Sequence, residues 1–143
     1  MSRFALFAPL LLAIAGSVVY HIAAKSIPKA FDPVAALIGL YATALAGSVL
    51  VYAIARPRSQ AMEPSRLWHP TIAAVGLGAL MIELGFLFAY RGAWPVSTAS
   101  VATNGLVAVV LVVVGGLAFG EAVSTLKVVG VLFCLVGVAL LQR

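Results

Sequence analysis

No charged residue interrupts the stretch Pro33-Val-Ala-Ala-Leu-Ile-Gly-Leu-Tyr-Ala-Thr-Ala-Leu-Ala-Gly-Ser-Val-Leu-Val-Tyr-Ala-Ile-Ala55. At about 1.5 Å per residue, a helix of this length crosses the roughly 30 Å hydrocarbon core of a bilayer. A continuous apolar run this long indicates a membrane-spanning helix, because strands in soluble proteins are much shorter. The stretch therefore predicts a transmembrane segment.

Four more apolar stretches of similar length flank this one on both sides, and two of them contain a single charged residue, Glu83 or Lys127. Pro33, Pro70 and Pro95 stand at the start of three of the stretches, where proline is compatible with the first turn of a helix. The sequence therefore predicts an all-α membrane protein in which residues 1–143 form a single domain. Its five transmembrane helices are expected at about 4–24, 33–55, 70–90, 96–119 and 123–141.

The composition excludes a soluble domain, because 64% of the 143 residues are hydrophobic and only 9% are charged. The net charge of +5 comes from Lys and Arg residues that mostly flank the apolar stretches. This placement suits lipid headgroups and indicates no nucleic-acid partner. The single cysteine, Cys134, lies in an apolar run, where we expect it to pack as a small hydrophobic residue.

The first stretch also has an alternative interpretation as a signal peptide. Arg3 precedes an apolar core, and Ala13-Ile14-Ala15 could be followed by cleavage before Gly16. Apolar residues continue to Ala24, beyond the length of an ordinary signal core, and cleavage would remove half of a helix. We therefore retain a transmembrane helix here.

The C-terminal segment from Gly120-Glu121 through Gly130 to Gly137-Val138 resembles the end of an EamA-type repeat of the drug/metabolite transporter superfamily. In that pattern a Gly-Glu pair closes one helix, a short polar turn follows, and the next helix carries spaced glycines. The small and polar residues of Ser97-Thr-Ala-Ser-Val-Ala-Thr-Asn104 are similar to the start of the fourth helix of the repeat. Five spans match one whole repeat, so the resemblance covers essentially the full chain.

Most members of that superfamily carry two repeats in opposite orientation, whereas this chain carries one. The resemblance therefore implies that a second copy supplies the missing half, as in the related four-helix small multidrug resistance proteins. Those relatives bind protons and cationic drugs at a glutamate in their first helix. The first span of this chain contains no acidic residue, so that glutamate has no counterpart here.

Glu83 is the only acidic residue well inside a predicted span. A carboxylate at that depth is costly unless it faces a cavity, a cation or another helix, and it can also exchange a proton. We therefore expect Glu83 to bind a proton or substrate; the alternative is a structural carboxyl that is permanently protonated or hydrogen-bonded to a neighbouring helix.

Other polar side chains indicate a pocket among the first four spans. Tyr41, Ser48 and Tyr52 share one helical face. In the fourth span, another face carries Asn104 with Ser97, Ser100 and Thr103. If neighbouring spans are antiparallel, Tyr41, Glu83 and Asn104 lie at overlapping depths, with His21 nearer one surface. The predicted substrate or proton site contains these side chains: Glu83, Asn104, Tyr41, His21 and Tyr52. Each could instead form only a hydrogen bond between helices.

The glycines indicate sites of close helix packing, either within one subunit or in a dimer. Gly116 and Gly120 form a GxxxG pattern, and Gly130 and Gly137 mark a groove on the last helix. Glu121 is expected in the turn, where it can cap the following helix. The sequence contains no catalytic constellation, metal-ligand cluster or phosphate-binding loop, so we expect neither an enzyme nor a metal or cofactor site.

The predicted function is a multi-pass carrier of the inner (plasma) membrane that moves a small polar or amphipathic metabolite by alternating access, with coupling to protons through Glu83 as the first mechanism to test. Here the resemblance supplies the transport activity. The alternatives are an exporter of cationic drugs, a flippase of a lipid-linked sugar, or a membrane scaffold subunit that transports nothing.

The positive charges also bear on orientation in the membrane. A five-span topology puts five cations on one side (Arg3, Arg56, Arg58, Arg66 and Lys127) and four on the other (Lys25, Lys29, Arg91 and Arg143). A difference of one charge orients a chain weakly. The sequence therefore predicts dual topology and an antiparallel homodimer, surrounded by membrane lipids.

Overall fold

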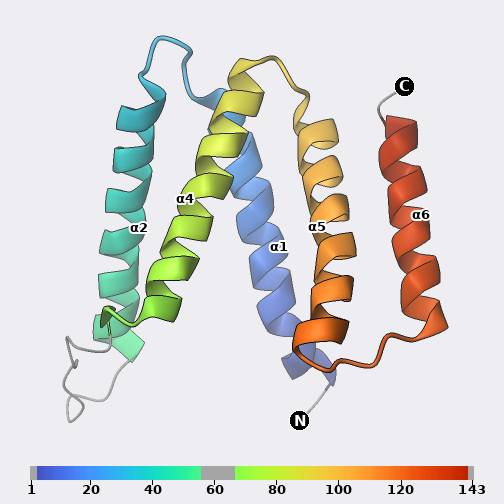
Figure 1. Ribbon diagram of the computed structural model, residues 1–143. Helices are drawn as coiled ribbons and strands as arrows, with labels where there is room; N and C mark the ends of the chain where they lie inside the picture. The colour runs from blue at the N-terminus through green and yellow to red at the C-terminus, as the bar shows by residue number, and fades with distance from the viewer. Residues whose placement is uncertain (1–2, 56–66, 142–143) are drawn as a thin grey trace. The chain divides into compact units, whose positions relative to one another are not determined.

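The computed structural model describes residues 3–55 and 67–141, with side chains from residue 7 onward, and every regular element in these ranges is a helix (Figure 1). The elements are α1 (Arg3–Ser26), α2 (Pro33–Ala55), α4 (Pro70–Arg91), α5 (Val96–Ala118) and α6 (Thr125–Leu141). The predicted spans agree with these bounds to within two residues. Arg56, Arg58, Arg66, Arg143 and the side chain of Arg3, which entered the charge count, lie outside the described residues.

Four of the five helices are long and apolar enough to cross a membrane: α1 from Phe7 onward, α2, α4 and α5. This confirms an all-α, multi-pass membrane protein. The fifth helix, α6, is apolar but has only 17 residues, which corresponds to about 26 Å. It starts at Thr125 rather than at the predicted residue 123, because the chain between Phe119 and Ser124 forms an extended turn.

The helices start at proline residues for a common physical reason. Pro33 and Pro70 occupy first helical positions, where the backbone N–H that proline lacks would have no partner within the helix. Asp32 precedes Pro33, and its carboxylate accepts a hydrogen bond of 2.8 Å from the backbone N–H of Ala35. Pro95 occupies the N-cap of α5. These residues set the starts of α2, α4 and α5.

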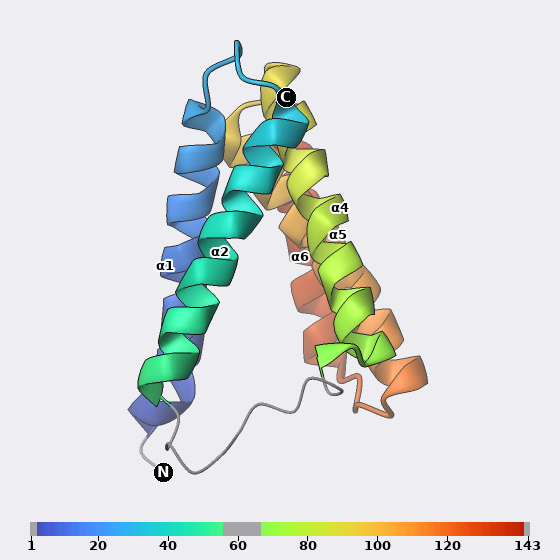
Figure 2. The ribbon, with the colours of Figure 1, turned by 90° about the vertical axis from the view of Figure 1, so that its left-hand side faces the viewer.

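Two structural units make up the chain. Unit 1 consists of Met1–Ile22 and Gly92–Arg143, and unit 2 consists of Ala23–Arg91. In unit 1, α6 packs beside α5 (Figure 2). One close approach is at Gly105, where an added Cβ atom would lie 2.8 Å from Cγ2 of Val138. A glycine at this position therefore allows the two helices to meet.

In unit 2, α2 packs against α4 through the first part of α2 and the last part of α4. Leu37 is buried on α2, and Phe86 and Tyr90 are buried on α4 with their rings stacked at 5.7 Å. The Lys25 ammonium donates a hydrogen bond of 3.3 Å to the backbone carbonyl of Tyr90, and the Arg91 guanidinium donates to the carbonyl of Phe31. These cations stabilise the C-terminal end of α4 and the loop beside it.

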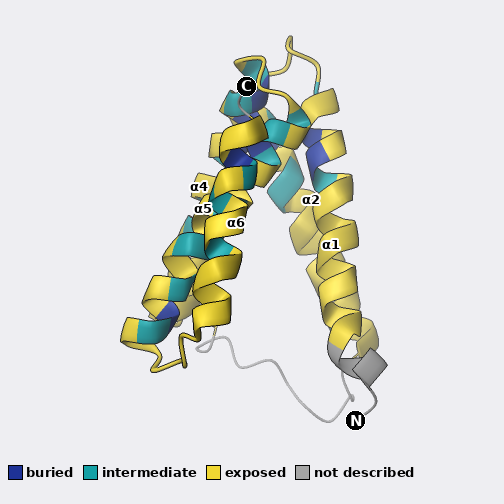
Figure 3. Ribbon diagram, turned by 90° about the vertical axis from the view of Figure 1, so that its right-hand side faces the viewer, coloured by how far each residue is buried: buried dark blue, intermediate teal, exposed yellow. Residues whose placement is uncertain are grey.

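Most side chains of the described helices are exposed, including large apolar ones (Figure 3). Leu12 is 76% exposed and Leu117 is 86% exposed, whereas the buried apolar residues are few. In water such a surface would be strongly unfavourable, but in a bilayer lipid chains solvate it as well as protein does. This burial pattern is typical of helices that contact lipid.

Candidate substrate groove

A groove of about 830 Å³ lies in unit 1 between α1, α5 and α6. Two residues of the predicted site, His21 and Asn104, line it, together with Ser17 and Ser100. The predicted pocket comprised the first four helices, whereas this groove takes one wall from α6. Its volume falls within the range of small-molecule sites, which is about 300–1,000 Å³.

The polar side chains of the groove lie at successive depths. The end of α1 and the start of α5 face the same membrane surface in an alternating topology. His21 lies about 7 Å from that end of α1, and Ser100 lies about 6 Å from that start of α5. Ser17 and Asn104 lie about 13 and 12 Å from those same helix ends. The polar groups therefore extend from near one surface to near the middle of a hydrocarbon core of about 30 Å.

The groove side chains differ in their hydrogen bonding. The Ser100 hydroxyl donates to the carbonyl of Val96 at 2.7 Å, one turn earlier in α5. Neither Ser17 nor Asn104 makes a side-chain hydrogen bond with another residue of the described ranges. An amide or hydroxyl without a partner in an apolar medium costs about 1–3 kcal/mol or more. These two groups are therefore available to a ligand.

His21 is positioned by its neighbour and by burial. It is the buried polar residue of the described part of the chain, with 9% of its surface exposed. Its ring meets the Tyr20 ring edge-on, with a centroid distance of 5.0 Å. This contact restricts the imidazole, so His21 presents a preorganised polar group at the wall of the groove.

A second polar cluster, Tyr41 and Glu83, lies in unit 2. Tyr41 lies on α2 and Glu83 lies on α4, the two helices that pack against each other in this unit. The Tyr41 hydroxyl oxygen and Glu83 Oε2 are both buried, and neither has a hydrogen-bond partner among the described residues. Because an isolated carboxylate in hydrocarbon is unstable, this arrangement is suited to hold a proton or a cation.

Tyr52 lies on α2, about 16 Å along the helix from Tyr41, and is half-buried. Between them, the Ser48 hydroxyl donates to the carbonyl of Ala44 at 2.8 Å, within its own helix. The predicted shared face of α2 therefore holds one hydroxyl that is already satisfied and two tyrosines at different depths.

The four glycines predicted to mediate packing occupy different environments. Gly116 faces the turn that follows α5, since a Cβ atom there would lie 2.8 Å from Cγ2 of Val123. Gly120 lies beyond the end of α5 with a φ of +65°, so it does not continue the helical face of Gly116. Gly130 and Gly137 have no atom of the described chain within 4 Å of an added Cβ. Their faces therefore have room for a helix to approach.

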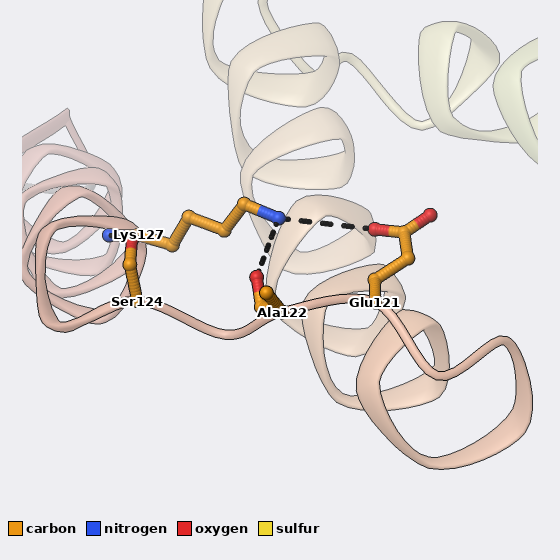
Figure 4. A network of polar contacts seen from close by, with 4 residues as sticks. All are labelled: Glu121, Ala122, Ser124 and Lys127. Carbon is orange, nitrogen blue, oxygen red and sulfur yellow. Dashed lines mark hydrogen bonds and ion pairs between the residues drawn. The ribbon is translucent and has the colours of Figure 1, made fainter.

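The turn between α5 and α6 also corrects the prediction for Glu121 (Figure 4). The Ser124 hydroxyl, rather than Glu121, caps α6 by accepting a hydrogen bond of 3.3 Å from the backbone N–H of Lys127. The Lys127 ammonium lies 3.9 Å from the Glu121 carboxylate and donates to the carbonyl of Ala122 at 2.9 Å. Glu121 therefore lies in the turn, where it forms an exposed ion pair with Lys127.

Sequence reasoning missed the contribution of α6 to the groove. Cys134, Gly137 and Val138 line it, and the Cys134 thiol is exposed. A periodic pattern in an apolar helix shows which residues share a face but not which neighbour that face meets.

Comparison of the chain with protein-family models, curated proteins and solved structures finds no match.

Proposed function

We propose that this chain is a transporter of the drug/metabolite superfamily that moves a small polar or amphipathic metabolite across the inner (plasma) membrane by alternating access. The observation that carries the proposal is the groove in unit 1, where Ser17 and Asn104 offer hydrogen bonds near the middle of membrane-spanning helices. Carriers bind their substrates near the bilayer midplane. The resemblance of residues 97–104 and 120–141 to an EamA-type repeat supplies the family.

In this mechanism the two polar clusters have separate roles. The substrate binds to the groove through Ser17, His21 and Asn104. Glu83 holds a proton beside Tyr41 and releases it when the site faces the opposite compartment, which couples transport to a proton gradient. The coupling requires that each cluster has a different affinity for its ligand in the two conformations.

The active assembly in this proposal is an antiparallel homodimer of single EamA-like domains, in which α6 also crosses the membrane. One repeat has too few helices to enclose a midplane site between two gates. Gly130 and Gly137 on α6 leave room for close approach by the second copy. A second candidate function, export of cationic drugs, is favoured by Glu83, whose Oε2 atom is buried without a hydrogen-bond partner among the described residues.

Ligand-dependent thermal stabilisation of the purified protein tests the function. We expect at least one neutral or amphipathic metabolite of a panel to raise the unfolding midpoint, because a ligand at 100 times its Kd stabilises the folded state by about 2.7 kcal/mol. The same ligand must be accumulated by proteoliposomes. Stabilisation only by cationic drugs or by lipid-linked sugars would select those substrates, and no ligand at all would favour a scaffold.

The Asn104→Leu variant is designed to remove that stabilisation, because leucine retains the side-chain volume but not the amide. Thr43→Val is the matched control, since the Thr43 hydroxyl is already used within α2, where it donates to the carbonyl of Gly39 at 2.9 Å. A ligand shift that survives Asn104→Leu would exclude the groove as the substrate site.

Reporter fusions after residue 143 test the assembly. One reporter is active only in the cytoplasm and the other only outside it, and dual topology predicts comparable signals from both. Signal from the external reporter alone would mean a single orientation with the N-terminus in the cytoplasm, and would replace the antiparallel dimer with a parallel one.

A further inference from the structure

The charge and polarity of the side chains that line the groove indicate which class of ligand it binds. This inference rests on the proposed function. None of the lining residues, all within the described ranges, is Asp, Glu, Lys or Arg. A charged ligand in this low-dielectric site would lose its hydration without gaining an opposite charge. The groove therefore excludes ions more strongly than neutral molecules.

The two walls of the groove also differ in polarity. The α1 and α5 wall presents the hydroxyl of Ser17, the imidazole of His21 and the amide of Asn104. The α6 wall contains Cys134, Gly137, Val138, Leu140 and Leu141, none of which has a side-chain oxygen or nitrogen. A ligand that matches both walls has hydrogen-bonding groups along one edge and an apolar face along the other.

The donors and acceptors of the groove also limit which ligand groups can bind. The Asn104 amide can both donate and accept hydrogen bonds, and so can the Ser17 hydroxyl. The Ser100 hydroxyl already donates its hydrogen to the carbonyl of Val96. Hydroxyl and amide groups of a ligand can satisfy such a set in both directions. We propose that the groove binds an uncharged amphipathic molecule through its hydroxyl or amide groups, which contact Ser17 and Asn104.

Photo-crosslinking of the full-length protein in liposomes tests this inference. Three probes share one alkyl diazirine chain and end in a hydroxyl, a primary ammonium or a carboxylate, and crosslinked peptides are identified by mass. We expect the hydroxyl probe to label peptides of α1, α5 and α6 at concentrations about tenfold lower than the ammonium and carboxylate probes. Equal or preferred labelling by either charged probe would overturn the inference.

Two variants of Asn104 make the test independent of folding defects. Asn104→Leu should raise the half-saturating concentration of the hydroxyl probe about tenfold, the effect of one lost hydrogen bond of about 1.4 kcal/mol. Asn104→Asp places an acid in the groove, so the ammonium probe should then label the groove at a lower half-saturating concentration than the hydroxyl probe. Thr43→Val on α2 is the control and should change neither. An unchanged order in Asn104→Asp would overturn the inference.

The native Cys134 supplies a second measurement, because it is the only cysteine of the sequence and lines the groove with an exposed thiol. The hydroxyl probe, bound without illumination, should slow alkylation of Cys134 by N-ethylmaleimide. Probe binding without any transport would leave this inference standing and overturn the transport function. Transport of a metabolite, with neither protection of Cys134 nor crosslinking in the groove, would overturn this inference and leave the transport function standing.

Discussion

Unit 1 and unit 2 both place polar side chains inside apolar helices, but the two sets differ in charge and in hydrogen bonding. In unit 1, uncharged groups of Ser17 and Asn104 line a groove without partners in the described chain. In unit 2, Thr43 and Ser48 donate to their own helix, and the unsatisfied atoms belong to Tyr41 and Glu83. In the proposed function, the first set serves a neutral ligand and the second a proton or a cation.

The largest expected effect is that of Glu83→Gln, which retains the size of the side chain and its hydrogen bonding but cannot release a proton. Uptake driven by a proton gradient in proteoliposomes should fall to the level of empty vesicles, while thermal stability is retained. The control is Glu121→Gln, because Glu121 lies in the exposed turn before α6. Transport with an unchanged pH profile in Glu83→Gln would remove Glu83 from the mechanism.

Substitution of Gly130 by Leu should weaken the homodimer, because the added side chain blocks close helix approach on α6. Gly137→Leu should have the same effect and should also fill part of the groove. The mass of the protein in detergent measures the change, and Gly39→Leu on α2, where a Cβ atom also meets nothing, is the control. A wild-type protein that is monomeric and binds ligand fully would contradict the dimer.

A pair of glycine-to-alanine substitutions separates tight packing in unit 1 from open packing in unit 2. In Gly105→Ala the added Cβ lies 2.8 Å from a methyl group of the buried Val138, so we expect a loss of about 1–3 kcal/mol of stability. Gly39→Ala has no such contact and should stabilise α2 by about 0.5–1 kcal/mol. Unfolding in mixed micelles measures both, and equal changes would show that Gly105 is not a close contact.

The smallest effects are expected at the two helix caps. Asp32→Ala removes the cap of α2, whose hydrogen bond is 2.8 Å, and should cost about 1 kcal/mol. Ser124→Ala removes the longer 3.3 Å cap of α6 and should cost about 0.5 kcal/mol. The same unfolding measurement applies, with Ser48→Ala as a neutral control. A larger loss in Ser124→Ala would mean that the turn after α5 depends on this hydroxyl for more than capping.

The helix boundaries could be predicted from the sequence because they depend on local properties. Apolar runs of membrane length determine where the chain can enter hydrocarbon, and Pro33, Pro70 and Pro95 determine where a helix can begin. The exception is the start of α6, where a turn containing Gly120 at positive φ delays the helix to Thr125. The composition of the segment did not predict that the helix begins at Thr125 instead of residue 123.

The partners of the polar residues depended on tertiary packing. Helical periodicity groups Ser17 with His21, but it does not specify that α6 forms the opposite wall of their groove. Nor does it show that the buried polar atoms without a hydrogen-bond partner in unit 2 are those of Tyr41 and Glu83, among the described residues. The physical reason is that lipid solvates an apolar helix face as well as another helix does. Side-chain fit, such as that of Gly105 against Val138, therefore decides which faces meet, and this information is distributed over residues far apart in the chain.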